Sequence, residues 1–415
     1  MSHLHPIQTK LANGIPVVVT PLPDSQLVTV YVGYSVGSRH EVPGSFGIAH
    51  LFEHLMFDNG GDGTKKQYDK LCTRVGGFNN AYTTYDFTAY HITLPAHELE
   101  LGLWLESERL RSFTITDDDL KIQKGVVTEE IKQNILNQPY SGLRSELDKI
   151  AYSHDHGYSK NVYGNIDDIT NLTMDTIRDF FIKFYNTLNV TISVAGCIDA
   201  NQVIRLSEET FGRIKPVVFS EGKNNTTLAK YTNQHSIVTD NVPVPAVIVA
   251  FHLPGMTSDE MYNADLLATL IGSGKNSYLY RELVVNKQIA SEVGCYVDKR
   301  LLGSLLICYA YATSSKISSG QLTESILYAI KTAQVGQDDL ASAKARVVTD
   351  TIAQTEGSEI VAESVAWFSM FKQTPEEINN QKRLYESRNI ETVQDLVSVY
   401  MKPEQMLQVE VIPLT

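Results

Sequence analysis

The first half of the chain alternates between two hydrophobic patterns, one typical of strands and one typical of helices. Runs rich in β-branched and aromatic residues predict strands at 17–19, 27–36, 79–94 and 190–196. Apolar residues spaced three and four apart predict helices at 47–57, 65–75, 98–110, 120–135 and 174–185. The chain therefore interleaves strands with amphipathic helices.

The second half of the chain repeats this apolar pattern. Three pairs of segments correspond, namely 242–253 with 27–36, 264–270 with 49–55, and 339–340 followed by 346–352 with 119–120 followed by 125–131. Between the two copies, the segment 209–227 mixes Gly, Pro, Lys and Asn, which is typical of a linker. We therefore expect an internal duplication with two domains, 1–215 and 228–415, joined by a linker at about 216–227.

One helical segment carries a chemical motif. His50 and His54 are four residues apart, with Glu53 directly before the second histidine. Residues four apart share a face of a helix, so both imidazoles can reach one point. Imidazole is a good ligand for zinc, and a catalytic zinc takes about three protein ligands. Glu53 lies at the rim of that face, where it could accept a proton from water. Two core histidines beside a chance acid are the alternative until a third ligand is found.

The candidates for the third ligand are two adjacent glutamates, Glu129 and Glu130. Neighbours on a helix point about 100° apart, so only one of them can face a metal ion. Glu130 stacks with Val126, Val127 and Asn134. Glu129 stacks with glycine and polar side chains and only borders Val126. We therefore expect Glu130 to point inward, where a carboxylate is costly unless it is paired or bound to a metal. An ion pair with an arginine is the alternative.

The internal repeat separates packing positions from chemical ones. Four positions change in the second copy: His50 becomes Asp265, Glu53 becomes Ala268, His54 becomes Thr269, and Glu130 becomes Thr351. The apolar scaffold around them is retained. This difference groups Glu130 with the motif residues and favours a metal site over the two alternatives.

Composition limits the classes of function. The chain has 415 residues, of which 43% are hydrophobic and 20% are charged, as in soluble globular proteins. The formal net charge of −13 argues against nucleic acid or an anionic membrane as the main partner. No run of about 18 apolar residues occurs, so we expect no membrane span.

The compartment is expected to be the cytoplasm. The amino terminus lacks the pattern of a signal peptide and is expected to form the first strand. The four cysteines are scattered, which indicates neither a disulfide framework nor a thiolate zinc site. A periplasmic location would require a signal peptide that has been removed.

With these residues, the chain resembles the pitrilysin family of zinc peptidases. The resemblance is to the short members, related to the mitochondrial processing peptidase and to bacterial half-length peptidases. H-x-x-E-H is the inverted zincin motif, and Glu130 stands at the distance from His54 that the short members show. Further matches are Gly76-Gly77, Asn80-Ala81-Tyr82-Thr83, Asp86, Thr88 and Tyr90. The resemblance covers nearly the whole chain. It implies an α+β fold of two related α/β sandwich-like halves that face each other across a peptide-holding chamber.

The resemblance also implies residue roles. His50, His54 and Glu130 would be the ligands of Zn²⁺, and Glu53 would be the general base. The residues Asn80, Ala81, Tyr82 and Thr83 would form an edge strand that binds an extended substrate through main-chain hydrogen bonds. Gln123 stands where family members often carry a second glutamate. It cannot carry charge, so we expect its influence on the metal ligands to differ.

A second departure concerns the partner. Family members hold the substrate with an arginine and a tyrosine, seven residues apart in the second half. Those two positions are Val284 and Ser291 here. We therefore expect a heterodimer with a homologous subunit that lacks the zinc motif and supplies the arginine and tyrosine. The alternative is a homodimer in which Arg281 or Arg300, with a nearby tyrosine, takes this role.

Together these features predict a zinc-dependent metalloendopeptidase that cleaves peptides or unfolded segments inside a closed chamber. A non-catalytic structural or assembly subunit of the same fold is one alternative. A peptide-binding module that keeps zinc only for stability is another. The intact set of His50, Glu53, His54 and Glu130 argues against a scaffold, because a buried acid cluster contributes nothing to assembly.

Overall fold

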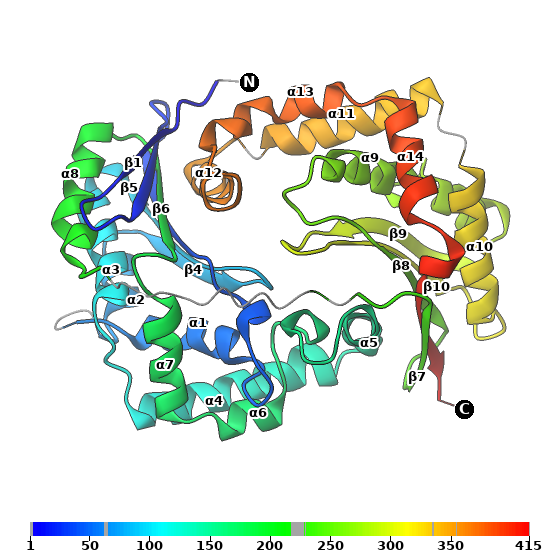
Figure 1. Ribbon diagram of the computed structural model, residues 1–415, viewed down its shortest axis with the longest axis horizontal. Helices are drawn as coiled ribbons and strands as arrows, with labels where there is room; N and C mark the ends of the chain where they lie inside the picture. The colour runs from blue at the N-terminus through cyan, green and yellow to red at the C-terminus, as the bar shows by residue number, and fades with distance from the viewer. Residues whose placement is uncertain are drawn as a thin grey trace. The chain divides into compact units, whose positions relative to one another are not determined.

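The computed structural model describes residues 3–61, 65–216, 228, 230–333, 336–353 and 355–414 (Figure 1). The described chain forms two compact units. Unit 1 is built from Met1–Ile131, Val162–Asn225 and Ile352–Asn380, and unit 2 from Lys132–Asn161, Thr226–Thr351 and Gln381–Thr415. Apart from Pro216, the linker expected at about 216–227 lies outside the described residues, so the expected domain boundaries stay a prediction.

Unit 1 contains a six-stranded mixed sheet in the order β1-β2-β6-β3-β5-β4. Its strands are β1 (Ile7–Lys10), β2 (Pro16–Pro21), β3 (Leu27–Tyr34), β4 (Phe78–Thr83), β5 (Thr88–Pro95) and β6 (Val190–Gly196). Strands β2 and β6 are parallel, and the other neighbours are antiparallel. Strand β4 lies at one edge of this sheet.

Unit 2 contains a five-stranded mixed sheet in the order β7-β11-β8-β10-β9. Its strands are β7 (Gln234–Asp240), β8 (Ala246–His252), β9 (Ala290–Asp298), β10 (Leu305–Ala312) and β11 (Leu407–Pro413). This order is that of β2-β6-β3-β5-β4 in unit 1, with one parallel pair at the same place. The shared topology confirms the α+β fold and supports the duplication seen in the sequence.

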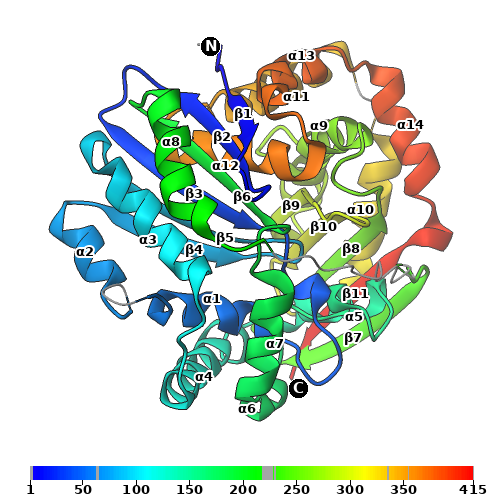
Figure 2. The same cartoon turned by 60° about the vertical axis from the view of Figure 1, so that its left-hand side comes forward.

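Unit 1 contains eight described helices, some of which pack on the two faces of its sheet. These helices are α1 (Ile48–Asp58), α2 (Tyr68–Arg74), α3 (Leu99–Arg111), α4 (Asp117–Ile131), α6 (Ile166–Asn171), α7 (Met174–Phe184), α8 (Ala200–Thr210) and α12 (Ser358–Lys372). Helices α3 and α8 pack on one face of the sheet, and α12 packs on the other (Figure 2).

The helices of unit 2 follow a similar plan. They are α5 (Gly142–Ala151), α9 (Glu260–Gly272), α10 (Ser319–Thr332), α11 (Gln337–Ala353), α13 (Gln381–Glu386) and α14 (Ile390–Tyr400). Helices α9 and α10 contact the sheet from one side. None of the described helices combines the length and the apolar composition that crossing a membrane requires.

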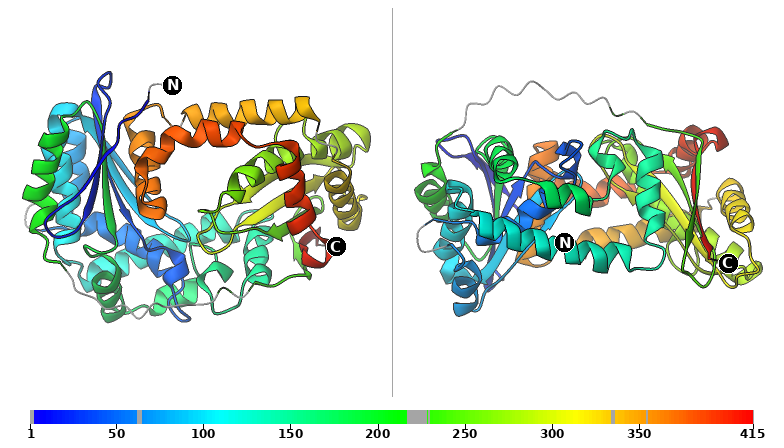
Figure 3. Two further views of the ribbon diagram at one scale, coloured as in Figure 1. Left: turned by 45° about the horizontal axis from the view of Figure 1, so that its top comes forward. Right: turned by 90° about the horizontal axis from the view of Figure 1, so that it is seen from below.

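Each unit contains one helix from the other half of the sequence. Helix α12 follows α11 along the chain but packs on β3 and β6 of unit 1. Both views in Figure 3 keep this orange helix beside the blue strands. Helix α5 follows α4 but packs on β7 and β11 of unit 2. The two copies of the repeat therefore exchange equivalent helices.

Helix α12 docks through an apolar face. Val361, Ala362, Val365 and Ala366 are fully buried against the sheet of unit 1. Their spacing of three and four residues places them on one side of the helix. At Gly33 of β3, an added Cβ would lie 2.6 Å from the Met370 sulfur, so glycine permits the close approach of the helix.

Helix α5 is held by a buried ion pair. Arg300 and Asp148 are both fully buried, and the Arg300 guanidinium donates to the Asp148 carboxylate. The same guanidinium contacts Asp298 at 2.7 Å and donates to the Tyr158 carbonyl at 3.0 Å. Because Asp148 lies on α5, this cluster ties the exchanged helix to unit 2.

Two predicted elements differ from the structure. The run 79–94 forms two strands, because a turn interrupts it at Thr84. The Thr84 N–H donates to the Phe87 carbonyl at 2.8 Å, and the Thr84 hydroxyl accepts from the Phe87 N–H at 3.0 Å. The helix expected at 120–135 is regular only to Ile131 and continues as a π-helical turn, Lys132–Leu136.

We expect Arg300→Met to lower the free energy of unfolding by about 3–5 kcal/mol, because the buried Asp148 carboxylate loses the nearer of its two cations and keeps only Arg144, 3.5 Å away. Urea denaturation of the purified protein measures this loss. The matched control is Lys382→Met, which removes an exposed cation paired with Glu386 in the same unit. It should cost less than about 1 kcal/mol. Equal losses in both variants would contradict the structural role of Arg300.

Candidate metal centre

The Glu41 carboxyl group fixes the start of helix α1. The two carboxyl oxygens of Glu41 accept hydrogen bonds from the Gly47 and Ala49 N–H groups, both at 2.9 Å. These N–H groups have no partner inside the helix, so the carboxyl group caps its first turn. Gly47 has a φ of +99°, and an added Cβ would lie 2.6 Å from the Tyr163 carbonyl oxygen. Only glycine fits this entry into the helix.

The other end of α1 is held by Arg109. Its guanidinium is fully buried and donates to the Met56 carbonyl at 3.3 Å. It also lies 4.9 Å from the Phe57 ring centre and 4.3 Å from that of Tyr90. A cation at the carboxyl end of a helix complements the helix dipole. Both ends of the helix that carries the motif are therefore fixed by buried polar groups.

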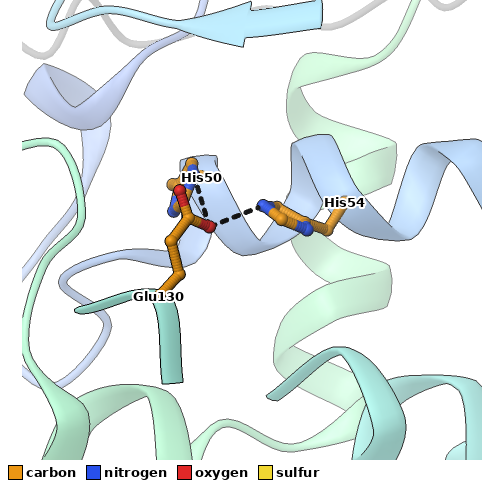
Figure 4. A group of neighbouring side chains, drawn as sticks. All are labelled: His50, His54 and Glu130. Atoms are coloured by element: carbon orange, nitrogen blue, oxygen red, sulfur yellow. Dashed lines mark ion pairs between the residues drawn. The ribbon is translucent and has the colours of Figure 1, made fainter. Parts of the chain in front are cut away.

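His50, His54 and Glu130 come together (Figure 4). A Glu130 carboxylate oxygen lies 3.3 Å from the His54 Nε2 and 3.8 Å from the His50 Nε2. All three ligand atoms lie within 4.8 Å of one another. Ligands of a tetrahedral zinc, each about 2 Å from the ion, are roughly 3.3 Å apart. Among the described residues, this is the only such group of three, and its geometry fits zinc.

The electrostatics of the two imidazoles suit metal binding. Burial, and to a smaller extent the neighbouring His54, lower the pKa of His50 to about 3. Burial also lowers the pKa of His54, although the Glu130 carboxylate opposes this shift. Both histidines are therefore neutral near pH 7. Neutral imidazole is the form that binds a metal ion.

The two adjacent glutamates on α4 lie in different environments. Glu129 is exposed, whereas Glu130 is half-buried and reaches both histidines. Of the two valines expected to share the face of Glu130, Val127 is fully buried, but Val126 is 46% exposed. The apolar face that carries Glu130 is therefore narrower than the sequence pattern indicated.

Glu53 lies beside this group without belonging to it. One of its carboxylate oxygens accepts a hydrogen bond from the Thr83 hydroxyl at 2.6 Å. Burial raises the pKa of Glu53 to about 7. The hydrogen bond from Thr83 opposes this shift, and the Glu130 charge adds to it. A carboxylate with a pKa near neutrality can both take up and release a proton at pH 7.

Strand β4 lies at the sheet edge and contains the four expected substrate residues. Just beyond β4, the Thr84 N–H donates to the carbonyl of Phe87, the residue before β5. Hydrogen-bonded and non-hydrogen-bonded residue pairs alternate along an antiparallel ladder, so Asn80 and Tyr82, four and two residues before Thr84, also turn their main-chain groups toward β5. Ala81 and Thr83 turn theirs outward. The Asn80 side-chain oxygen accepts a hydrogen bond from the outward N–H of Ala81 at 2.9 Å.

The side chains of β4 contact different helices. Thr83 points to α1, where it bonds Glu53. Tyr82 points to the other face, where its hydroxyl donates to Glu363 of α12 at 2.5 Å and lies 2.8 Å from the Tyr31 hydroxyl. Burial, Tyr31 and Glu363 raise the pKa of Tyr82, so the phenol stays protonated. The motifs in the sequence did not indicate Glu363, because it lies far from β4 along the chain.

Gln123, expected to influence the metal ligands, bonds the end of the motif helix. Its amide donates to the Asp58 carboxylate of α1 at 2.9 Å. This contact ties α4, which carries Glu130, to α1, which carries both histidines. Gln123 can therefore act on the ligands by fixing the two helices against each other.

In unit 2, the polar side chains at the equivalent positions form hydrogen bonds within the protein. Asp265, in the place of His50, accepts from the Lys299 ammonium at 2.8 Å and from the Tyr385 hydroxyl at 2.6 Å. The hydroxyls of Thr269 and Thr351 donate to carbonyls of their own helices, both at 2.8 Å. These side chains bond within the protein and form no metal-binding group in the described part of unit 2.

Comparison with known proteins also separates the half that contains the three converging residues from the half that lacks them. Residues 17–161 match the family described as Insulinase (Peptidase family M16), and residues 171–347 match the Peptidase M16 inactive domain. The three converging residues lie in the first match, and Asp265 and Thr269 lie in the second.

Individual relatives give the same assignment. The zinc protease PqqE of Helicobacter pylori is 30% identical over 361 residues, which cover 85% of this chain and 80% of that protein. An uncharacterized zinc protease of Rickettsia bellii is 26% identical over 386 residues, or 89% of each chain. The crystal structure of a protease from Helicobacter pylori superposes with a TM-score of 0.92 at 26% identity, covering 99% of this chain and 100% of that one. The chain therefore belongs to peptidase family M16, the pitrilysin family, as a half-length member similar to bacterial zinc proteases.

Proposed function

We propose that the chain is a zinc metalloendopeptidase that hydrolyses peptide bonds in peptides or unfolded segments. The convergence of His50, His54 and Glu130 beside Glu53 is the observation that carries this proposal. The three converging residues would hold the ion. When bound, zinc supplies Lewis acidity, which activates a carbonyl group and water in the site. Relatives named as zinc proteases support the same chemistry.

Glu53 acts as the general base in this proposal. Its carboxylate takes a proton from the attacking water and passes it to the amine that leaves. The hydrogen bond from Thr83 orients the carboxylate toward β4 and stabilises its ionised form. Thr83 is therefore a positioning residue for the base.

The substrate is expected to lie along β4 as an added strand. The outward main-chain groups of Ala81 and Thr83 supply the hydrogen bonds of such a pairing. The Asn80 side chain must release the Ala81 N–H when a peptide binds. Because Thr83 offers its main chain to the substrate and its side chain to Glu53, one residue would link the bound peptide to the base. Cleavage inside a closed chamber stays part of this proposal.

A heterodimer remains the proposed assembly. Val284 packs against the core of unit 2, and the Ser291 hydroxyl donates to the Tyr311 and Ala312 carbonyls. Neither side chain can replace an arginine or a tyrosine. Arg300 is fully buried in ion pairs, so it is not available to a substrate. The homodimer alternative therefore depends on Arg281, whose guanidinium lies 4.8 Å from the Tyr278 ring centre.

Replacing the base tests the function directly. Glu53→Gln should lower kcat/KM for a fluorogenic peptide by roughly 10²–10⁴-fold, because the amide cannot accept the proton. Its zinc content should equal that of the unmodified protein, since the three ligands remain. Near-normal turnover in this variant, or a metal content at background, would refute the role given to Glu53.

Replacing each glutamate of α4 tests the ligand set. Glu130→Gln should weaken zinc binding by more than about 100-fold, because changes to the outer partners of ligands alone cost 10–100-fold. Glu129→Gln removes the same charge from an exposed position and should change the affinity little. Competition with a chromophoric chelator measures both constants. If Glu129→Gln strips the metal and Glu130→Gln does not, the assignment is off by one residue.

The assembly can be tested by reconstitution. The purified chain alone should cleave peptides slowly. A homologous subunit with an arginine and a tyrosine seven apart, but without the zinc motif, should raise its specific activity by about an order of magnitude or more, because it helps to orient the substrate. Full activity of the chain as a self-associated dimer, abolished by Arg281→Ala, would establish the homodimer instead.

A further inference from the structure

Two cysteines lie side by side in the sheet of unit 2, although their spacing in the sequence indicated no disulfide framework. Cys295 lies on β9 and Cys308 on β10, and the two residues are direct partners in the antiparallel ladder. The Cys308 thiol donates to the Cys295 sulfur, and the two sulfur atoms are 3.2 Å apart. Opposite residues in such a ladder have Cα atoms about 4.5 or 5.5 Å apart. Both values fall within the range of about 4.4–6.8 Å that a disulfide requires.

The surroundings of this pair suit a disulfide. Both cysteines belong to the apolar core of unit 2, where Cys308 is fully buried and Cys295 is 8% exposed. Burial raises the pKa of Cys295 well above its usual value, and the Cys308 thiol adds to this shift, so the Cys295 sulfur stays protonated near pH 7. A thiol keeps a weak S–H donor, whereas a disulfide has none. Joining the two sulfur atoms therefore removes polar hydrogens from an apolar core.

The neighbouring elements hold the two thiols together. Cys308 lies on an interior strand, with Val249 of β8 as its partner on the other side. Helix α9 lies directly against Cys295, because a Cβ added at Gly272 would lie 2.4 Å from the Cys295 Cβ. A disulfide bond is about 2.05 Å long, so the two sulfur atoms need to approach by only about 1 Å. Small side-chain rotations supply this movement without a change of strand register.

We propose that Cys295 and Cys308 form a structural disulfide, which joins β9 to β10 when the protein meets an oxidant that itself contains a disulfide. The Cys295 sulfur, the more exposed of the two, loses its proton and attacks one sulfur of the oxidant, and the other oxidant sulfur leaves as a thiolate. The Cys308 sulfur then loses its proton and attacks the Cys295 sulfur, and the second oxidant sulfur leaves. The protein gives up two protons and two electrons, and the oxidant becomes two thiols.

The bond would stabilise the edge of the sheet in unit 2. Strand β9 is the last strand in the sheet order, and edge positions open more easily than interior ones. Such opening admits the oxidant, and the finished bond opposes it. The bond also links two residues 13 positions apart, which restricts the unfolded chain. A reducing compartment keeps the pair as thiols, and an oxidising one forms the bond. This inference is independent of the proposed function, because none of the three converging residues is a cysteine.

Oxidised glutathione is the probe for this bond. The folded, full-length chain is incubated with it for hours, because uncatalysed disulfide exchange takes minutes to hours. Free thiols are then blocked with N-ethylmaleimide in urea, and the protein is digested and analysed by mass spectrometry. We expect one pair of linked peptides, which contain Cys295 and Cys308. Cys295→Ala should abolish this link, whereas the control Cys72→Ala, which removes a buried thiol from unit 1, should keep it.

Thermal unfolding measures the effect of the bond without any variant. The oxidised protein should unfold about 5–10 °C above the same protein after reduction. In Cys295→Ala, the reductant should leave the Tm unchanged. Three results would overturn the proposal. Both thiols could remain open to N-ethylmaleimide after oxidation, the link could form only in unfolded protein or to Cys72 or Cys197, or the bond could form without raising the Tm. These measurements do not involve peptide cleavage, so they decide the disulfide whatever the activity.

Discussion

The placement of helix α1 is the constraint on which the rest of the site depends. His50 and His54 project from one face of a helix, so a small rotation or slide would move both imidazoles away from Glu130. Two buried polar groups prevent this movement. Glu41 binds the free N–H groups at the start of the helix, and Arg109 binds a carbonyl near its end. The geometry of the three converging residues is therefore set by contacts that lie outside the motif.

Strand β4 connects this helix to a distant part of the chain. The alternation of side chains along the strand sends Thr83 to Glu53 on α1 and Tyr82 to Glu363 on α12. Tyr82 and Glu363 are 281 positions apart in the sequence. Because of the helix exchange, Tyr82 of the edge strand contacts Glu363, a residue from the second half of the chain. Strand β4 thus contacts α1, which carries the proposed base, through Thr83, and α12 through Tyr82.

The sequence predicted what depends on local periodicity and missed what depends on long-range contacts. Helical spacing indicated Glu130 over Glu129, and the repeat indicated the duplicated sheets. Neither could reveal that α5 and α12 exchange places, because an exchange between equivalent positions leaves the local pattern unchanged. Glu41 and Arg109 were missed for a related reason, since a single polar residue gives no period. The turn at Thr84 contains neither glycine nor proline, so the strand-like run 79–94 carried no sign of it.

The comparison of the two units shows why one fold can keep or lose the site. In unit 2, the acid at the His50 position bonds Lys299 and Tyr385, and the threonine hydroxyls bond their own helices. These polar groups are satisfied within the protein, so packing alone maintains them. In unit 1, two neutral imidazoles and a carboxylate point at one another, an arrangement that a cation would stabilise. The scaffold therefore folds with either set of residues, and only the set in unit 1 has a physical reason to bind a metal.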